Sequence, residues 1–325
     1  MTLRKLGNTG LEIAPLVLGG NVFGWTIDAT ASFRILDAFV DAGLNAIDTA
    51  DVYSFWVPGN QGGESETTIG QWLKRSRKRS RVLIFTKVGI EYAPGKKGLK
   101  KDYVLRSAED SLRRLQTDCI DVYFSHMDDP ETPLEETLEA YATLVQQGKV
   151  RAIGASNFGH KRLAEALALS ESKKLPRYEV LEPHYNLVCR VEYERELEPL
   201  ALAKKLGVIT YFSLASGFLT GKYRSRSDFA KSPRGPRAQW YLNEHGLRVL
   251  GALDEVAQQT HSTPARVALA WLMARPSITA PIASATKLEQ LTDLVEATRL
   301  TLDATSIEKL NQASEGEPPT QPPPV

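Results

Sequence analysis

Eight short apolar runs that alternate with amphipathic helical stretches constrain the fold of this chain more than any other feature. Each run suits a buried strand and is too short for a typical helix. Such alternation predicts a parallel sheet whose strands are joined by crossover helices. The runs lie at 15–19, 46–49, 82–87, 119–126, 151–156, 180–185, 208–214 and 279–283.

The helical patterns between the runs complete eight strand–helix units. They lie near 30–42, 64–75, 102–115, 134–147, 160–169, 193–206, 246–259 and 287–297. Two further helices are predicted at 264–274 and 304–312, the first of them because Thr263 and Pro264 form a good helix start. Eight units with nearly continuous apolar strands favour a closed (β/α)8 TIM barrel. An open doubly wound sheet is the alternative that periodicity alone leaves open.

The two ends of the chain depart from the barrel pattern. Residues 3–18 predict a β-hairpin around the turn cluster at 7–10. Residues 315–325 contain five prolines and predict an extended, disordered tail. No composition shift marks a domain boundary before that tail, so residues 1–314 are expected to form a single barrel domain.

Charge and composition narrow the class of protein. The 325 residues carry 40 Lys and Arg against 39 Asp and Glu, and a net charge of +1 gives no field that would attract nucleic acid or membranes. The basic run at 74–81 is therefore expected to be a solvated helix-to-strand connection. No apolar leader follows the start, and the two cysteines form no C-x-x-C pair. We expect a cytoplasmic chain with buried, reduced thiols.

Polar side chains come at the ends of successive apolar runs. Asp48, Lys87 and His126 hold such positions, and Tyr53 follows Asp48 by five residues. Because the strands of a barrel all end at one face, these side chains would converge on one cavity, where barrel enzymes carry their active sites. Taken singly, each has an ordinary explanation as a helix cap, a solvated lysine or a packing residue. No cluster has the spacing of metal ligands, and no metal is expected.

These residues lie in motifs that resemble those of the aldo-keto reductases. Residues 48–53 read D-T-A-D-V-Y, like the family's D-T-A-x-x-Y motif. Lys87 and His126 match the other two catalytic positions, and 155–158 matches the S-N-F element. The similarity extends from the hairpin to about residue 312. Within the family, the chain most resembles the branch of bacterial enzymes that are related to potassium-channel β-subunits.

The resemblance implies an oxidoreductase that reduces an aldehyde or ketone by hydride transfer from NADPH. Tyr53 would donate the proton to the carbonyl oxygen. Lys87 and Asp48 would form the pair that eases ionisation of the phenol, and His126 would orient the carbonyl. The implied partner is a small carbonyl compound whose identity stays open, as does the oligomeric state.

The cofactor site implied by the resemblance is not a Rossmann site, because no G-x-G-x-x-G follows a strand. The nicotinamide contacts would be Ser156, Asn157, Glu182 and Tyr211. The phosphate and adenosine contacts would be Leu214, Gly217, Lys222, Lys287 and Gln290. The cationic candidates for the 2′-phosphate are Lys287, Arg234 and Arg237.

Glu182 stands where the family's Gln is expected. Its carboxyl would be ionised beside the nicotinamide, or protonated, or turned toward a cation such as Arg190. The substrate pocket would be formed by the loops 23–29, 54–62, 88–99 and 223–245. Its candidate lining residues are Trp25, Phe55, Trp56 and Trp240.

Two other functions stay open. The first is a binding module, similar to channel β-subunits, that senses the redox state of the cofactor. The chain starts at the hairpin without an extended arm, which favours the enzyme over such a module. The second is a barrel used only as a scaffold, which would bind no nicotinamide nucleotide.

Overall fold

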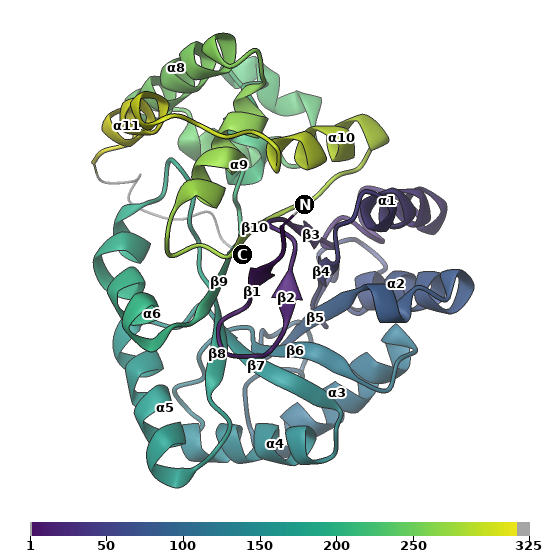
Figure 1. Cartoon of the computed structure of the whole chain (residues 1–325). Helices are drawn as coiled ribbons and strands as arrows, with labels where there is room; N and C mark the ends of the chain where they lie inside the picture. Colours follow the sequence, from purple (N-terminus) through teal and green to yellow (C-terminus); the bar gives the residue numbers. More distant parts are fainter. Residues whose placement is uncertain (1, 317–325) are drawn as a thin grey trace.

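The computed structural model describes residues 2–316 as a closed barrel of eight parallel strands surrounded by helices (Figure 1). The strands follow one another around the barrel in chain order, from β3 (Val17–Gly19) to β10 (Ala280–Ala283). Parallel pairing of β10 with β3 closes the ring. The predicted (β/α)8 fold is therefore confirmed. An open sheet would have two edge strands that pair on one side only. Each strand of this barrel pairs on both sides, so an open sheet is excluded.

The elements lie close to the predicted ranges. The barrel strands are β3 (Val17–Gly19), β4 (Ala46–Asp48), β5 (Leu83–Val88), β6 (Ile120–Ser125), β7 (Val150–Ser156), β8 (Tyr178–Glu182), β9 (Gly207–Thr210) and β10 (Ala280–Ala283). The helices are α1 (Ala29–Asp41), α2 (Glu64–Ser76), α3 (Lys101–Leu115), α4 (Leu134–Gln146), α5 (His160–Lys173), α6 (Glu198–Lys204), α7 (Gly235–Ala238), α8 (Glu244–Gln259), α9 (Pro264–Ala274), α10 (Leu288–Ala297) and α11 (Ala304–Ala313).

Apolar side chains fill two separate layers. One layer lies between the strands and the outer helices, and it includes Ile84 and Val88 of β5. The other lies inside the barrel and includes Phe85 of the same strand. This division follows from the strand period of two, which sends alternate side chains to opposite faces. Lys87 belongs to the inward set with Phe85, and the strand pattern therefore places its ammonium group inside the barrel.

The N-terminal hairpin closes one end of the barrel. Strands β1 (Arg4–Lys5) and β2 (Glu12–Ile13) pair antiparallel, as predicted, and they cross the barrel opening in Figure 1. Leu6, Leu11 and Ile13 pack against the inward side chains. Arg4 donates hydrogen bonds to the carbonyls of Ile278 and Thr279, which directly precede β10. The hairpin thus covers the end where strands begin and leaves the other end for a site.

Two strands end earlier than their apolar runs suggest. Pro183 directly follows β8 and has no N–H to continue the ladder. Phe212 follows β9 after one residue and has a φ of 52°, which lies in the left-handed region. Both breaks are turns that the pattern of apolar residues does not reveal.

The helix predicted at 193–206 is divided, because a π-turn over Tyr193–Leu197 precedes α6. Pro199, in the first turn of α6, cannot donate a backbone hydrogen bond, and this accounts for the wider turn before it. The predicted loop 223–245 also contains short helical turns at Arg226–Lys231 and Gln239–Tyr241, besides α7. The remaining 3-10 turns are Arg79–Arg81 and Ala215–Thr220.

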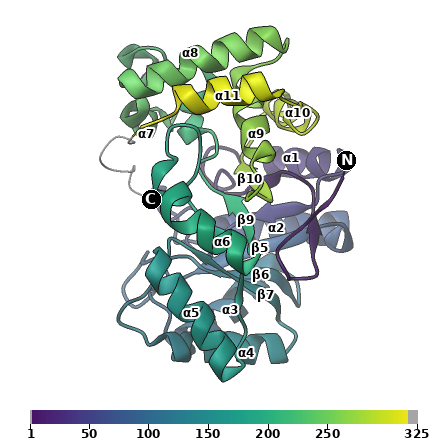
Figure 2. The same cartoon turned by 60° about the vertical axis from the view of Figure 1, so that its left-hand side comes forward.

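The segment after the barrel runs over its outer surface. Helix α11 lies beside α8 in both views, and its end leads into Gly316 (Figures 1 and 2). Residues 317–325, most of the predicted tail, lie outside the described residues. Over residues 2–316, no helix has the length and apolar character needed to cross a membrane.

Residues of the basic run at 74–81 form ion pairs with carboxylates of the same protein. Lys78 pairs with Asp37 and Asp41, and Arg79 pairs with the buried Asp121. These contacts agree with the predicted connection between a helix and a strand. Cys119 and Cys189 are both free, as expected, but each is only partly buried, because both lie outside the strands, in the connections.

Gly70 of α2 is predicted to be essential for packing against α3. A Cβ atom there would overlap the backbone carbonyl of Arg114, whereas a Cβ at Gly251 of α8 would meet nothing within 4 Å. We expect Gly70→Ala to lower the free energy of unfolding by about 1–3 kcal/mol through overpacking. Gly251→Ala, the matched control, should raise it by about 0.5–1 kcal/mol, because alanine favours the helix. Urea unfolding measures both, and an unchanged midpoint for Gly70→Ala would contradict the packing argument.

Candidate active site

The ammonium group of Lys87 lies at the centre of the site. The side chain is fully buried, and its Nζ forms an ion pair with Asp48 at the end of β4. The Nζ also donates a hydrogen bond of 2.9 Å to the carbonyl of Thr49. A second carboxylate, Glu182 at the end of β8, lies 3.4 Å from the same nitrogen. Buried charges are stable only when paired in this way.

Tyr53 and His126 lie beside this ion pair. The Lys87 Nζ lies 5.3 Å from the centre of the Tyr53 ring, and its charge opposes the rise in pKa that burial gives the phenol. The rings of Tyr53 and His126 meet edge to face at 5.8 Å. The four residues predicted from the motifs are therefore brought together at the ends of adjacent strands.

Burial and neighbouring charges shift the pKa values of Lys87, Tyr53 and His126 in different directions. Burial alone would lower the pKa of Lys87, but the carboxylates of Asp48 and Glu182 outweigh it and the pKa is raised. Burial raises the pKa of Tyr53, and the charge of Lys87 opposes that rise. The pKa of His126 falls well below its usual value because the imidazole is buried and close to Lys87. Near neutral pH, the site holds an ammonium, a phenol and a neutral imidazole.

Glu182 faces Lys87 and not Arg190. Its side chain is nearly fully buried, and its Oε2 has no hydrogen-bond partner among the described residues. Burial and the nearby Asp48 raise the pKa of Glu182 to about 8, although Lys87 opposes the shift. The carboxyl therefore retains its proton over most of the neutral range.

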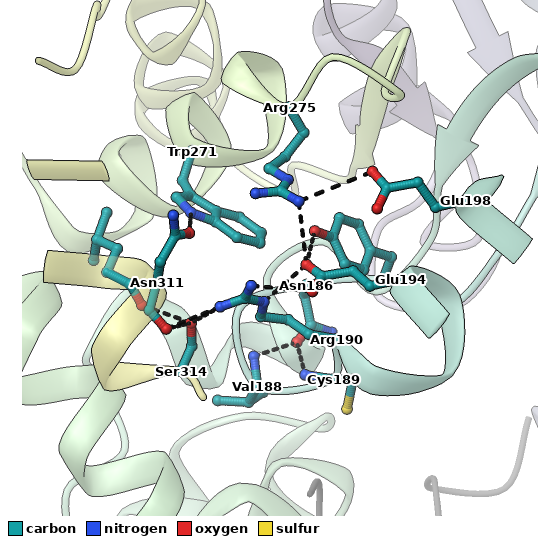
Figure 3. A network of polar contacts seen from close by, with 12 residues as sticks. Asn186, Val188, Cys189, Arg190, Glu194, Glu198, Trp271, Arg275, Asn311 and Ser314 are labelled. Carbon is teal, nitrogen blue, oxygen red and sulfur yellow. Dashed lines mark hydrogen bonds and ion pairs between the residues drawn. The ribbon is translucent and has the colours of Figure 1, made fainter. Parts of the chain in front are cut away.

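Arg190 is held in a separate network (Figure 3). Its guanidinium forms two hydrogen bonds with Glu194, of 2.8 and 3.0 Å, and it also donates to Asn311 and Ser314 at the end of α11. Arg190 and Arg275 both contact the ring of Trp271, each at 5.4 Å. This network ties α11 to the segment that follows β8, and it explains why Arg190 cannot pair with Glu182.

Ser156, Asn157 and Tyr211 form a hydrogen-bonded group beside Glu182. Asn157 has a φ of 56°, and its amide donates to the carbonyl of His126 and to Ser156. The Tyr211 hydroxyl donates to the Asn157 Oδ1 at 2.7 Å, and the Ser156 hydroxyl donates to the Glu182 carbonyl. The donors of all three side chains are thus used within the protein. An amide bound here would still find acceptor oxygens.

His184 supports the Tyr211 ring and was not anticipated from the sequence. The two rings stack with centroids 5.3 Å apart and an angle of 18°. Both residues follow strand ends and join through an isolated bridge. Tyr211 remains partly exposed, so it is suited to stack on a planar ligand. The position of His184 two residues after Glu182 is the one sequence signal that could have suggested it.

Leu214, Gly217 and Lys222 belong to one compact loop after β9. Backbone φ angles are positive at Ala215, Ser216, Gly217 and Gly221, and the N–H groups of Ala215, Gly217 and Gly221 donate to backbone carbonyls within the loop. The Ser216 hydroxyl is buried and has no hydrogen-bond partner among the described residues. A Cβ at Gly217 would lie 3.2 Å from the Lys222 ammonium. The loop therefore brings a lysine ammonium group and a buried hydroxyl into one short segment after β9.

The other predicted contacts lie toward the rim. Lys287 and Gln290 are exposed at the start of α10, and the Gln290 Oε1 accepts from the backbone N–H of Thr286 at 2.8 Å. Arg234, from the loop before α7, donates to Asn21 after β3. Asn21 also accepts from Ser284 after β10, so three distant segments meet at this residue. Sequence reasoning missed Asn21, although it lies only two residues after the first apolar run.

Three of the four candidate pocket aromatics form one cluster with the proposed proton donor. Trp56 meets Tyr53 at 5.7 Å, Trp25 at 5.6 Å and Phe55 at 5.9 Å. The Arg234 guanidinium lies over the Trp25 ring. Trp240 forms no ring pair with the aromatic residues of the described part and is 38% exposed. Over residues 2–316, no group of His, Cys, Asp and Glu has the arrangement of a metal site.

The fold and the strand-end cluster define a barrel protein with an acid–base site, and comparison with known proteins gives its family. Residues 15–315 match the model of the aldo/keto reductase family. The chain is 35% identical to the uncharacterized oxidoreductase YrpG of Bacillus subtilis (strain 168), over 97% of each chain. It is 32% identical to a probable voltage-gated potassium channel subunit beta of Oryza sativa subsp. japonica, over 91% of each.

A third relative is named for its reaction. The chain is 31% identical to the L-glyceraldehyde 3-phosphate reductase of Escherichia coli O157:H7, over 96% of this chain and 92% of the relative. The chain belongs to the aldo/keto reductase family, a family of oxidoreductases. This confirms the resemblance carried by the strand-end motifs.

The arrangement around Lys87 predicts that its two carboxylates can replace one another. Removing one partner of a buried ion pair usually costs about 3–5 kcal/mol. Asp48→Ala should cost less than this, because loss of the Asp48 charge lowers the pKa of Glu182 and lets it pair with Lys87. The full loss should appear only when Glu182→Gln is added.

A double-mutant cycle measured by urea unfolding at pH 7 tests this coupling. Glu182→Gln alone is the control, and it should have little effect because it replaces a neutral carboxyl with a neutral amide. Additive effects of the two substitutions would show that Glu182 does not compensate for Asp48.

Proposed function

We propose that this chain is an NADPH-dependent reductase of aldehydes or ketones, with residues 1–314 as one catalytic unit. The single observation that carries the proposal is the buried Lys87–Asp48 ion pair beside Tyr53 at the open end of the barrel, where the Lys87 Nζ lies 5.3 Å from the centre of the tyrosine ring. A cytoplasmic location is also proposed, since the two free cysteines suit a reducing compartment.

Tyr53 is the proposed proton donor. When the carbonyl is reduced, negative charge develops on its oxygen, and a positioned acid stabilises it. Tyr53 keeps its proton at neutral pH because its pKa is raised. Lys87 provides positive charge next to the phenol oxygen and stabilises the phenolate that forms as the proton leaves. Asp48 holds the ammonium in place.

His126 is the proposed carbonyl-orienting group. The imidazole is neutral because its pKa is lowered, and a neutral imidazole can donate one hydrogen bond without adding charge. Its Nδ1 has no partner among the described residues, so the ring is not committed to another contact on that side. The backbone carbonyl of His126 is fixed by Asn157, which links the orienting group to the neighbouring site.

The cofactor residues are proposed in three groups. NADPH, when bound, supplies the hydride. Glu182, Ser156, Asn157 and Tyr211 would hold the nicotinamide end, with the partly exposed Tyr211 ring as the stacking surface. Leu214, Gly217 and Lys222 would hold the pyrophosphate, and the Ser216 hydroxyl, which has no partner within residues 2–316, could donate to an anion there. Lys287 and Gln290 would contact the adenosine end.

The substrate class is proposed to be small aldehydes or ketones with an apolar part. The aromatic cluster of Trp25, Phe55 and Trp56 adjoins Tyr53 and provides an apolar wall beside the reacting oxygen. Similarity to a relative named as a reductase of an aldehyde supports the carbonyl as the reacting group.

A cofactor-sensing module is the second candidate, and the similarity to a probable channel subunit favours it. Both candidates bind NADPH, and only the reductase turns it over. Steady-state oxidation of NADPH by a simple aromatic aldehyde separates them, because binding without turnover would favour the module.

Tyr53→Phe is expected to abolish turnover and to leave NADPH binding nearly intact. The substitution removes the proton donor and keeps the ring that packs on Trp56. Turnover is followed by NADPH absorbance, and binding by quenching of protein fluorescence. Tyr103→Phe is the control, since its buried hydroxyl has no hydrogen-bond partner among the described residues and lies on α3, outside the site. Activity of Tyr53→Phe within about tenfold of the parent would remove Tyr53 from this role, since that is only about 1.4 kcal/mol of barrier.

NADPH is expected to be preferred over NADH. Lys287, Arg234 and Arg237 are the cations proposed to meet the 2′-phosphate, and a hydrogen bond to a charged group contributes about 1.5–3 kcal/mol. Replacing the responsible cation with Gln should lower kcat/KM for NADPH by about tenfold or more and leave the value for NADH unchanged. NADH is the internal control, because it lacks the 2′-phosphate. Equal kcat/KM for both cofactors in the parent would refute the preference.

A further inference from the structure

Glu182 is a buried carboxyl group that the proposed proton transfer does not use. It ends β8 and reaches across the barrel toward the ends of β4 and β5. Its Oε1 lies 3.4 Å from the Lys87 Nζ, and its Oε2 has no partner among the described residues. A buried, half-satisfied carboxyl in the middle of a charged site requires a functional explanation.

Glu182 is the carboxyl group of the cluster that is not needed to balance the charge of Lys87. The groups that face it are Asp48 from β4, Lys87 from β5, Tyr53 from the next loop and Tyr211 after β9. Lys87 lies closer to Asp48 than to Glu182, so the first two form a neutral ion pair. Addition or loss of a proton at Glu182 therefore changes the net charge of the whole cluster.

The neighbouring groups keep one charge state across the range in which Glu182 titrates. The pKa values of Lys87, Tyr53 and Tyr211 are raised, mainly by nearby carboxylates for Lys87 and by burial for the tyrosines. Burial lowers the pKa of His184, behind Tyr211, to about 4. Asp48 keeps its ion pair with Lys87, although burial raises the pKa of its carboxyl, and burial lowers the pKa of His126. Glu182, with a pKa of about 8, titrates between about pH 6 and 9.

Glu182 is also connected to the surface proposed to hold the nicotinamide. Its backbone carbonyl accepts from Ser156, which in turn accepts from Asn157. Its charge raises the pKa of the Tyr211 phenol, and its field therefore reaches the proposed stacking ring. A nicotinamide ring is cationic when oxidised and neutral when reduced, so it would sense this field in one redox state only.

We propose that Glu182 is a charge switch that sets the relative affinity of the site for oxidised and reduced nicotinamide cofactor. Ionised Glu182 stabilises the oxidised, cationic ring, and protonated Glu182 does not distinguish the two forms by charge. This inference rests on the proposed function, because it requires the nicotinamide to bind beside Tyr211.

The direction of the pH effect follows from the ionisation. Raising the pH through the pKa of Glu182 ionises the carboxyl and favours NADP+ over NADPH. The ratio of dissociation constants, Kd(NADPH)/Kd(NADP+), should therefore rise with pH. The phosphates of the two cofactor forms are the same, and their own titration cancels in this ratio.

The test measures both dissociation constants by protein fluorescence at pH 6 to 9, without substrate. In the parent, the ratio should rise by about tenfold, which corresponds to about 1.4 kcal/mol. In Glu182→Gln, the ratio should stay at the low-pH value. Glu192→Gln is the matched control, because the charge of Glu192 also raises the pKa of Tyr211, but the Glu192 side chain is exposed and its charge is screened. It should retain the pH dependence of the parent.

Three outcomes would overturn the inference. A constant ratio in the parent across this pH range would do so even if Glu182→Gln did not fold. A pH dependence that persists in Glu182→Gln would assign the effect to another group. If neither cofactor form binds the parent, the proposed function fails as well, and this result is distinct from binding with a constant ratio.

Discussion

The ammonium group of Lys87 is the interaction on which the site depends. It joins Asp48 and Glu182, which end β4 and β8. These strands are not neighbours, because β6 and β7 separate β8 from the strand that carries the lysine. Only a closed barrel brings the three ends together around one nitrogen atom. The charged network thus depends on closure, and it helps to specify which strands face one another.

The inside of the barrel changes character along its axis. Near the hairpin it is apolar, and Leu6, Leu11 and Ile13 close that end. At the strand ends it holds an ammonium, two carboxyl groups and the His126 ring. The apolar side chains at the hairpin end exclude water from the barrel interior, and this strengthens the electrostatic interactions at the strand ends. The shifted pKa values of the site are therefore a property of the whole barrel and not only of adjacent residues.

The fold and most of the strand-end residues could be predicted from the sequence, because both depend on local periodicity and on where each apolar run ends. Asp48, Lys87 and His126 follow this rule. The environment of Glu182 could not be predicted, since its contact with Lys87 spans the barrel. His184 and Asn21 were missed for the same reason: their roles come from partners such as Tyr211 and Arg234, which are far away in the sequence.

The pairing of β10 with β3 and the bonds from Arg4 also affect how the chain reaches its native state. Arg4 contacts carbonyl groups at Met273, Ile278 and Thr279, almost at the other end of the sequence. During synthesis, the first strand and the hairpin emerge long before these partners exist. The apolar side chains of this segment therefore stay exposed until their partners have been made. Contacts so distant in sequence also form slowly. The last step of barrel formation is thus the one that covers the hairpin and β3.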